Sequence, residues 1–179
     1  MGFVIPPYNI DPRIQDQIQI EVAKIMNEKF PSEKRRELTW RPLRPEEIDV
    51  TLTPATRAYD TVLTGPPGTW DRILNAAADA IVPTGSVIVI FGWIVIDDPV
   101  TSMGPSAVGQ VLVEGTIRNE IALLPISQLD PPMITTFDQL VVLVEQTRFA
   151  IQVTGVAAAD IIAYPLAYRI GPRSQLDQG

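Results

Sequence analysis

The segment that decides the fold is VIVIFGWIVI at residues 87–96, which is closed by Asp97 and Asp98. A membrane-spanning helix needs about 20 apolar residues, so this run is too short to be one. It is instead typical of a β-strand that is buried on both faces. A second run of the same kind, LVVLV, follows at residues 140–144.

Strand-like segments fill the chain on either side of these runs, separated by turn signals such as Gly104 with Pro105. Parallel strands would need crossover helices, and no segment between residues 86 and 170 is long enough for one. We therefore predict an all-β fold, an antiparallel β-sandwich of jelly-roll type. The expected strands are residues 48–52, 59–64, 86–96, 108–117, 120–126, 133–137, 140–144, 148–153 and 161–170.

An amphipathic helix is predicted before the strands, from Pro12 to Lys29. Asp11 is a suitable N-cap, Pro12 suits the first helical turn, and Pro31 ends the pattern. The alternation of Ile18, Ile20 and Val22 would also fit a strand, but the helical pattern is longer. The apolar positions at helical spacing are Ile14, Ile18, Val22, Ile25 and Met26.

One short helix is predicted inside the sandwich, at residues 70–81. It would follow the GPPG turn of residues 65–68, with Thr69 as its N-cap. Its inward-facing residues would be Ile73, Leu74, Ala77, Ala78 and Ile81.

The charge distribution suggests a boundary near Pro45. Residues 1–45 hold eight Lys and Arg against six Asp and Glu, whereas residues 46–179 hold six against fifteen, which together give the net charge of −7. We expect a helical arm and linker at residues 1–45 and the jelly-roll sandwich at residues 46–179. The acidic balance and the pI near 4.5 argue against a general nucleic-acid-binding protein.

A basic segment, SEKRRELTWRPLRP at residues 32–45, places Trp40 between Arg36 and Arg41. Arginines beside an aromatic ring could contact the phosphates and bases of a nucleic acid. We favour an arm or linker whose arginines pair with the acidic sandwich, because no nucleic-acid-binding motif accompanies them.

Catalytic chemistry has little support, because the chain contains neither histidine nor cysteine. GPPGT at residues 65–69 opens like a phosphate-binding loop, but Trp70 and Asp71 stand where such a loop has Gly and Lys, so a turn is the better interpretation. A Ser–Lys pair would need a lysine within the strand framework, and all three lie before it, at Lys24, Lys29 and Lys34.

Carboxylates offer the remaining chemical possibility, at Asp97 and Asp98 and at Asp60 and Asp71. A hydrolase would need two of them at a fixed separation, and a calcium loop would need alternating ligands around a glycine. Neither pattern is present, so charged strand ends are the better interpretation. We predict no enzyme and no catalytic, cofactor-binding or metal-binding residue.

A strand that is apolar on both faces must be shielded from water on both. The N-terminal helix could cover one such surface, but we do not expect it to cover them all, so we predict a stable homo-oligomer. The strand aromatics would be core or interface anchors; they are Phe91, Trp93, Phe149, Tyr164 and Tyr168. The first residues show no secretory signal, and we expect no membrane-spanning segment.

The chain resembles the small single jelly-roll major capsid proteins of tailless, membrane-containing icosahedral viruses of the Thermus phage type. The segments that carry the resemblance are SVIVIFGWIVIDD at residues 86–98, QLVVLVEQTRFAIQV at residues 139–153 and IIAYPLAYRIGPR at residues 161–173. It implies a virion location, upright jelly rolls packed as dimers and capsomers, a second capsid protein, and contact with an inner viral membrane. It implies no catalytic site, cofactor or small-molecule substrate.

Two other functions stay open at this stage. A receptor- or carbohydrate-binding module of a viral spike or tail fibre would show an exposed aromatic groove. A carboxylate-dependent hydrolase would show a cleft with two acids at a fixed separation.

Overall fold

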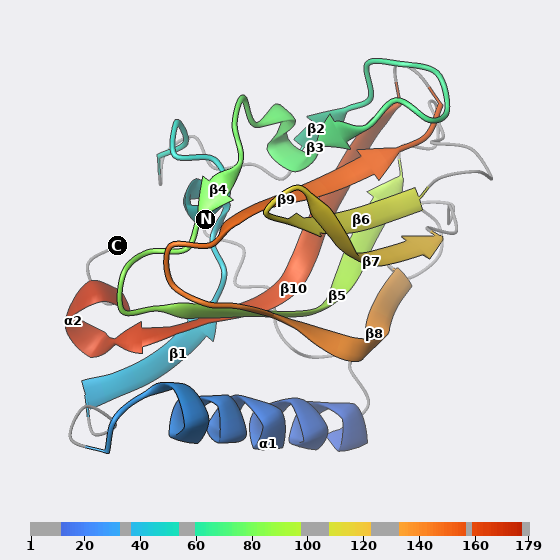
Figure 1. The fold of residues 1–179 in the computed structure, drawn as a ribbon. Helices are drawn as coiled ribbons and strands as arrows, with labels where there is room; N and C mark the ends of the chain where they lie inside the picture. The colour runs from blue at the N-terminus through green and yellow to red at the C-terminus, as the bar shows by residue number, and fades with distance from the viewer. Residues whose placement is uncertain are drawn as a thin grey trace.

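A computed structural model of the chain describes residues 12–32, 37–53, 60–97, 108–122, 133–156 and 159–176 (Figure 1). The described part is mostly strand, with two α-helices. Its elements are α1 (Pro12–Lys29), β1 (Leu38–Pro42), η2 (Pro45–Glu47), β2 (Asp60–Val62), β3 (Asp71–Arg72), η3 (Ile73–Asn75), β4 (Ala80–Ile81), β5 (Val87–Asp97), β6 (Val108–Val113), β7 (Thr116–Ala122), β8 (Met133–Leu143), β9 (Arg148–Thr154), β10 (Asp160–Pro172) and α2 (Arg173–Leu176).

The strands form two five-stranded antiparallel sheets. The first sheet has the order β1-β10-β5-β8, with β2 also paired to β10. The second sheet has the order β3-β9-β6-β7, with β4 also paired to β9. This arrangement confirms the predicted class, a mostly antiparallel β-protein consistent with an all-β sandwich.

The pairing is nested along the chain. The tightest pair, β6 with β7, is joined by Glu114 and Gly115, which both have positive φ, as the turn of a two-residue hairpin requires. Around this pair, β5 pairs with β8, then β3 and β4 pair with β9, and finally β1 and β2 pair with β10. The pairs of β5 with β10 and of β6 with β9 then assemble these ribbons into the two sheets.

The main core lies between the two sheets. Ile88 and Ile90 of β5 face this core together with Phe149, Ile151 and Val153 of β9, and all five side chains are nearly inaccessible. Because successive side chains of a strand point to opposite faces, Val87, Val89 and Phe91 must point away from it.

Helix α1 covers that other face of the first sheet (Figure 1). Its buried residues Ile18, Val22 and Ile25 join a second apolar cluster, which contains Val87, Val89, Phe91, Leu166, Tyr168 and Ile170 from β5 and β10. The predicted helix at residues 12–29 is therefore confirmed. It shields this face of β5 from water within the same chain. No helix in the described part of the chain is both long and apolar enough to cross a membrane.

The predicted helix at residues 70–81 is wrong. Short strands β3 and β4 stand there instead, on either side of η3, where Leu74 and Asn75 have positive φ. The side-chain amide of Asn75 donates to the carbonyl of Val62 and accepts from its N–H, both at 2.9 Å. Pairing with β2 and β9 therefore outweighs the local helical pattern.

The predicted strand at residues 48–52 is also wrong. Pro45 begins the 3-10 turn η2, and the Asp49 carboxylate then accepts hydrogen bonds from the backbone N–H and the hydroxyl of Thr51. Such local bonds compete with strand pairing. Ile48 still reaches the main core, whereas Val50 is exposed.

The strands also differ from the expected ones at three main points. The turn at Glu114 and Gly115 divides the expected strand 108–117, so that β7 already begins at Thr116. The expected strands 133–137 and 140–144 form one strand, β8, whose register against β5 shifts between Ile90 and Gly92. The third difference is β1, which was not predicted because it lies in the basic segment interpreted as an arm or linker.

The remaining strand predictions are confirmed in their positions. Strands β2, β5, β9 and β10 fall within or over the expected segments 59–64, 86–96, 148–153 and 161–170. The expected strand end at residues 123–126 lies outside the described residues. Helix α2 was not predicted.

Packing of α1 on the sheet can be tested with two isoleucines of the same helix. Ile25 is 6% exposed and Ile20 is 64% exposed. We expect Ile25→Ala to lower the free energy of unfolding by roughly 2–5 kcal/mol, because it removes buried methyl groups and leaves a cavity. Ile20→Ala should change it by no more than about 0.5 kcal/mol. Urea denaturation at low protein concentration measures both, and equal effects would contradict this packing.

Candidate interaction surface

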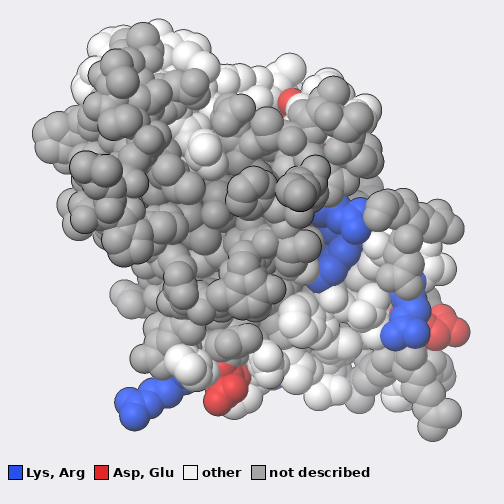
Figure 2. Space-filling view, turned by 180° about the vertical axis from the view of Figure 1, so that it is seen from behind, with Lys and Arg blue, Asp and Glu red and all other residues white. Residues whose placement is uncertain are grey.

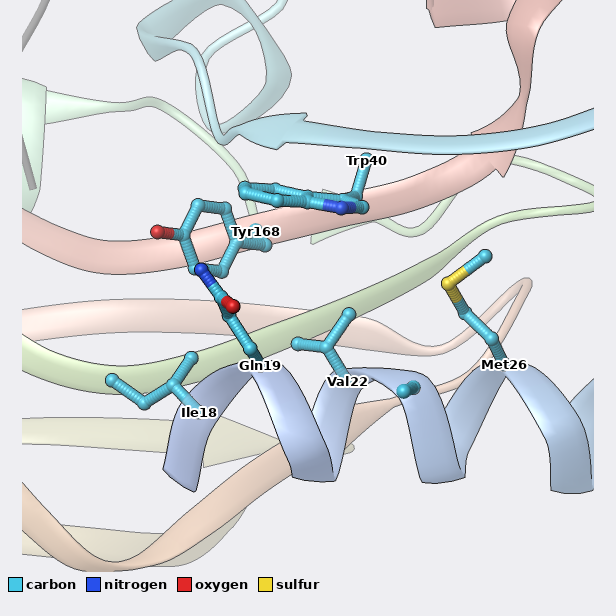
Figure 3. A pocket seen from close by; sticks show the side chains of 7 residues that line it. Ile18, Gln19, Val22, Met26, Trp40 and Tyr168 are labelled. Atoms are coloured by element: carbon cyan, nitrogen blue, oxygen red, sulfur yellow. The ribbon is translucent and has the colours of Figure 1, made fainter. Parts of the chain in front are cut away.

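A hollow of about 270 Å³ lies where α1 crosses the edge of the first sheet. Figure 3 shows side chains of α1 pointing from the helix toward the aromatic rings of β1 and β10. The labelled lining residues are Ile18, Gln19, Val22 and Met26 from α1, Trp40 from β1 and Tyr168 from β10. Among the residues that the structure describes, those lining the hollow carry no charge.

Three aromatic rings form a row beside this hollow, across β1, β10 and β5. The ring centroids of Trp40 and Tyr168 lie 4.6 Å apart in an edge-to-face arrangement. Those of Tyr168 and Phe91 lie 5.1 Å apart and are stacked. Phe91 and Tyr168 are buried under α1, whereas Trp40 remains 43% exposed at the open end of the row. An exposed tryptophan next to a hollow is a typical anchor for a partner.

An ion cluster on the opposite face of the sheet holds β1 in place. The Glu47 carboxylate accepts two hydrogen bonds from Arg41, at 2.8 and 2.9 Å, and one from Arg169. It also accepts the backbone N–H of Arg44 at 2.9 Å. Arg41 and Arg169 are directly opposite each other in the β1–β10 register, so their like charges need the carboxylate between them.

The cluster also reaches neighbouring elements. Arg41 Nε donates to the carbonyl of Leu176 in α2 at 3.3 Å, and Arg169 Nε donates to the hydroxyl of Ser86, just before β5, at 3.2 Å. Trp40 precedes Arg41 on β1, so the two side chains point to opposite faces of the sheet. By fixing Arg41, the cluster therefore fixes the position of Trp40 at the hollow.

The cluster sets the charge state of Glu47. Burial alone would raise the pKa of this carboxyl, but hydrogen bonds from Arg41 and Arg169, the charge of Arg41 and the backbone N–H of Arg44 together outweigh burial. The pKa of Glu47 is therefore lowered, and the group stays ionised at neutral pH. Burial also raises the pKa of Tyr168, so its hydroxyl stays neutral.

The GPPG segment is a turn, as predicted. Thr69 donates its backbone N–H to the carbonyl of Pro66 at 3.0 Å, and Gly68 has φ +97°. Gly68 also donates its N–H to the hydroxyl of Thr154 at 2.8 Å. Asp71 closes the loop by accepting the backbone N–H and the hydroxyl of Thr64, at 2.9 and 2.6 Å. These bonds give Asp71 a structural role.

The other predicted chemical groups are not brought together in the part of the chain that the structure describes. The side chains of Asp60 and Asp97 and all of Asp98 and Lys34 lie outside the described residues, and Lys24 and Lys29 lie on α1. No described group of acidic residues could hold a metal ion. Phe149 is a core anchor as expected, and the side chains of Trp93 and Tyr164 lie outside the described residues.

Charged side chains do not form one large patch on the described part of the surface opposite to the view of Figure 1. On the described part of the face in Figure 2, small blue and red groups are scattered among white ones. Lys24 pairs weakly with Glu21 on α1, and Arg72 pairs with Asp79. Arg41 pairs with Glu47, as expected for an arginine of the basic segment, whereas Arg36 lies outside the described residues.

The importance of Trp40 and Glu47 was not evident from the sequence. Trp40 was interpreted as part of a basic linker, because the strand that carries it has only five residues and lies among arginines and prolines. Glu47 lies six residues after Arg41 but far from Arg169, so no local pattern joins the three.

Removal of the shared carboxylate should be strongly destabilising. We expect Glu47→Gln to lower the free energy of unfolding by roughly 3–5 kcal/mol, because two largely buried guanidinium groups lose their counter-ion. Asp79→Asn is the matched control, since it breaks an exposed ion pair with Arg72 and should cost about 0–1 kcal/mol. Urea denaturation at pH 7 compares them, and a small effect of Glu47→Gln would show that the cluster does not stabilise the fold.

Acid should weaken the fold through the same carboxyl. The lowered pKa of Glu47 means that, below the ordinary glutamate pKa of about 4.3, the unfolded chain binds a proton that the folded chain does not. The stabilisation is therefore complete above that value and is lost as the pH falls through the folded pKa. Denaturation midpoints measured from pH 6 to pH 3 should fall more steeply for the wild type than for Glu47→Gln, and parallel curves would refute this role.

Sequence comparisons do not relate this surface to a known protein. Neither protein-family descriptions nor curated protein sequences give a match to the chain.

Proposed function

We propose that this chain is a structural virion protein, a jelly-roll capsid subunit that self-associates and packs into the capsomers of an icosahedral shell. The observation that carries the proposal is the nested strand pairing. A jelly roll is a long antiparallel ribbon of eight strands wrapped into two sheets. Its first strand then pairs with its eighth, its second with its seventh, its third with its sixth and its fourth with its fifth.

The observed pairs follow this scheme when β1 with β2 and β3 with β4 each count as one interrupted strand. They are β1 and β2 with β10, β3 and β4 with β9, β5 with β8, and β6 with β7. Counted in this way, successive strands alternate between the two sheets up to β6 and again from β7 to β10. The strand order thus supports a jelly-roll topology.

Helix α1 fits the proposal as the folded part of an N-terminal arm. It packs on the outer face of the first sheet and keeps its own outward face accessible. In a shell, such an element would lie between the sandwich and a neighbouring subunit. The proposed partners are further copies of the chain, a second capsid protein and an inner viral membrane.

The composition is also compatible with a durable particle. The chain has 17 prolines, which restrict the unfolded state, and Glu47 adds a buried ion cluster. In this proposal the protein is located in the virion and has no catalytic role, cofactor, nucleic-acid motif or small-molecule substrate.

A second candidate is a receptor- or carbohydrate-binding module of a spike or tail fibre. The observation that favours it is the exposed ring of Trp40 beside a hollow whose described lining is uncharged and includes Gln19. A sugar ring could stack on the indole and accept a hydrogen bond from the amide. Titration with neutral mono- and oligosaccharides, followed by NMR or calorimetry, would show saturable binding that Trp40→Ala removes.

The capsid proposal predicts the location and the copy number of the protein. Quantitative mass spectrometry of purified virus particles should find the chain in hundreds of copies per particle, as an icosahedral shell subunit requires. A few copies per vertex would instead favour the spike module. Absence from the particles would refute both.

A further inference from the structure

Strand β1 takes no part in the buried apolar core. Its five residues belong to neither apolar cluster of the described chain, and within the described residues it pairs only with β10. Beyond this ladder, Trp40 meets the ring of Tyr168, and Arg41 bonds Glu47 and the carbonyl of Leu176. An element with few buried apolar contacts opens at a lower free energy than the core does. Strand β1 is therefore the part of the first sheet that depends most on charge.

The chain is anchored in apolar clusters on both sides of β1. Before it, Ile25 of α1 is buried against β5 and β10. After it, Leu43 is buried in the main core and donates its N–H to the carbonyl of Ala167 at 2.8 Å. Strand β1 can therefore leave β10 while α1 and Leu43 stay in place.

The Glu47 carboxylate lies on the anchored side of this boundary. Its residue stands at the end of η2, between Leu43 and Ile48, and both of these side chains are buried in the main core. Arg169 belongs to β10, at the centre of the first sheet. Arg41 is the member of the ion cluster that moves with β1.

The charges of the cluster balance only while Glu47 is ionised. Among the described residues, the charged groups in contact with its carboxylate are Arg41 of β1 and Arg169 of β10. These two arginines are directly opposite each other in the register, where like charges are destabilising. Neutral partners complete the cluster, since Leu176 accepts from Arg41 and Ser86 accepts from Arg169. Loss of the one negative charge therefore leaves two facing guanidinium groups.

We propose that the Glu47 carboxylate is an acid-sensitive switch that controls the attachment of β1. In the closed state, Glu47 is ionised, Arg41 holds β1 on β10, and Trp40 lines the hollow beside α1 (Figure 3). When Glu47 takes up a proton from the solvent, the two arginines repel each other and β1 leaves the edge of the sheet. Trp40 leaves the ring of Tyr168 with it, while α1 and the two sheets stay packed. The hollow therefore exists only in the closed state.

The direction of the switch follows from proton binding. Burial alone would raise the pKa of Glu47, but the bonds from Arg41 and Arg169 outweigh burial and lower it. In the open state Glu47 has lost Arg41, so its pKa moves back toward the ordinary value of about 4.3. The closed state is therefore favoured above that value and is lost as the pH falls through the lowered pKa of the closed state. The switch does not depend on the capsid proposal, because it acts within one copy of the chain.

Hydrogen exchange at pH 7 tests the switch without acid, because Glu47→Gln removes the charge and keeps the size of the side chain. The bond from Leu43 to Ala167 and the alternation of an antiparallel ladder place the N–H groups of Thr39 and Arg41 toward β10. Measured by NMR, these two amides should exchange at least tenfold faster in Glu47→Gln than in the wild type, and close to the rate of an unprotected amide.

The controls separate local opening from a general loss of stability. In the same variant, the amides of Val22 in α1 and Ile151 in β9 should stay protected, because their clusters remain packed. Asp79→Asn, which breaks the exposed pair with Arg72, should leave Thr39 at the wild-type rate. Equal acceleration at Thr39, Val22 and Ile151, or no acceleration at Thr39, would overturn the switch.

Acid titration of the wild type is the second test, and it does not require a folded Glu47→Gln variant. Between pH 6 and pH 3, tryptophan fluorescence should change at a higher pH than the far-ultraviolet circular dichroism, because Trp40 leaves Tyr168 before the sandwich unfolds. Trp40→Phe should lack this early change, which identifies Trp40 as its source. A wild type whose fluorescence and circular dichroism change together in one transition would refute the switch.

Discussion

The structure depends on a single constraint, that β5 is apolar on both faces and must be kept dry on both. On one face Ile88 and Ile90 meet the second sheet, and on the other Val87, Val89 and Phe91 meet α1. The same strand pairs with β10 on one edge and with β8 on the other. It is therefore the centre of a layered arrangement of helix, sheet and sheet. The fold can be understood as the elements needed to enclose this strand.

The edge of that arrangement is held by charge as well as by aromatic packing. Strand β1 has only five residues and brings Arg41 opposite Arg169, which would repel without Glu47 between them. One carboxylate serving two guanidinium groups makes the edge dependent on a single side chain. Because β1 also carries Trp40, the interaction that stabilises the edge on one face shapes the hollow on the other. Stability of the strand and the form of the surface are thus linked.

The helix changes the argument for a partner. Apolar residues on both faces of β5 led to the prediction of a neighbouring molecule, yet α1 covers part of one face within the chain. What stays uncovered is narrower, with Trp40 of β1 on one side of the helix and Val142 of β8 on the other. The exposed apolar surface on this face of the first sheet is therefore smaller than the two-sided strand alone suggested.

The sequence alone determined the elements whose patterns are long and regular. These are α1, with apolar residues at helical spacing, and strands such as β5, β9 and β10, because local burial patterns of this length allow one structure. Only the tertiary structure decided residues 70–81, where bonds from Asn75 to Val62 replace a helix, and residues 48–52, where a turn at Asp49 replaces a strand. It also decided the site, since Arg169 comes from a segment distant from Trp40 and Glu47. Short patterns leave several structures close in energy, and contacts between distant segments then choose among them.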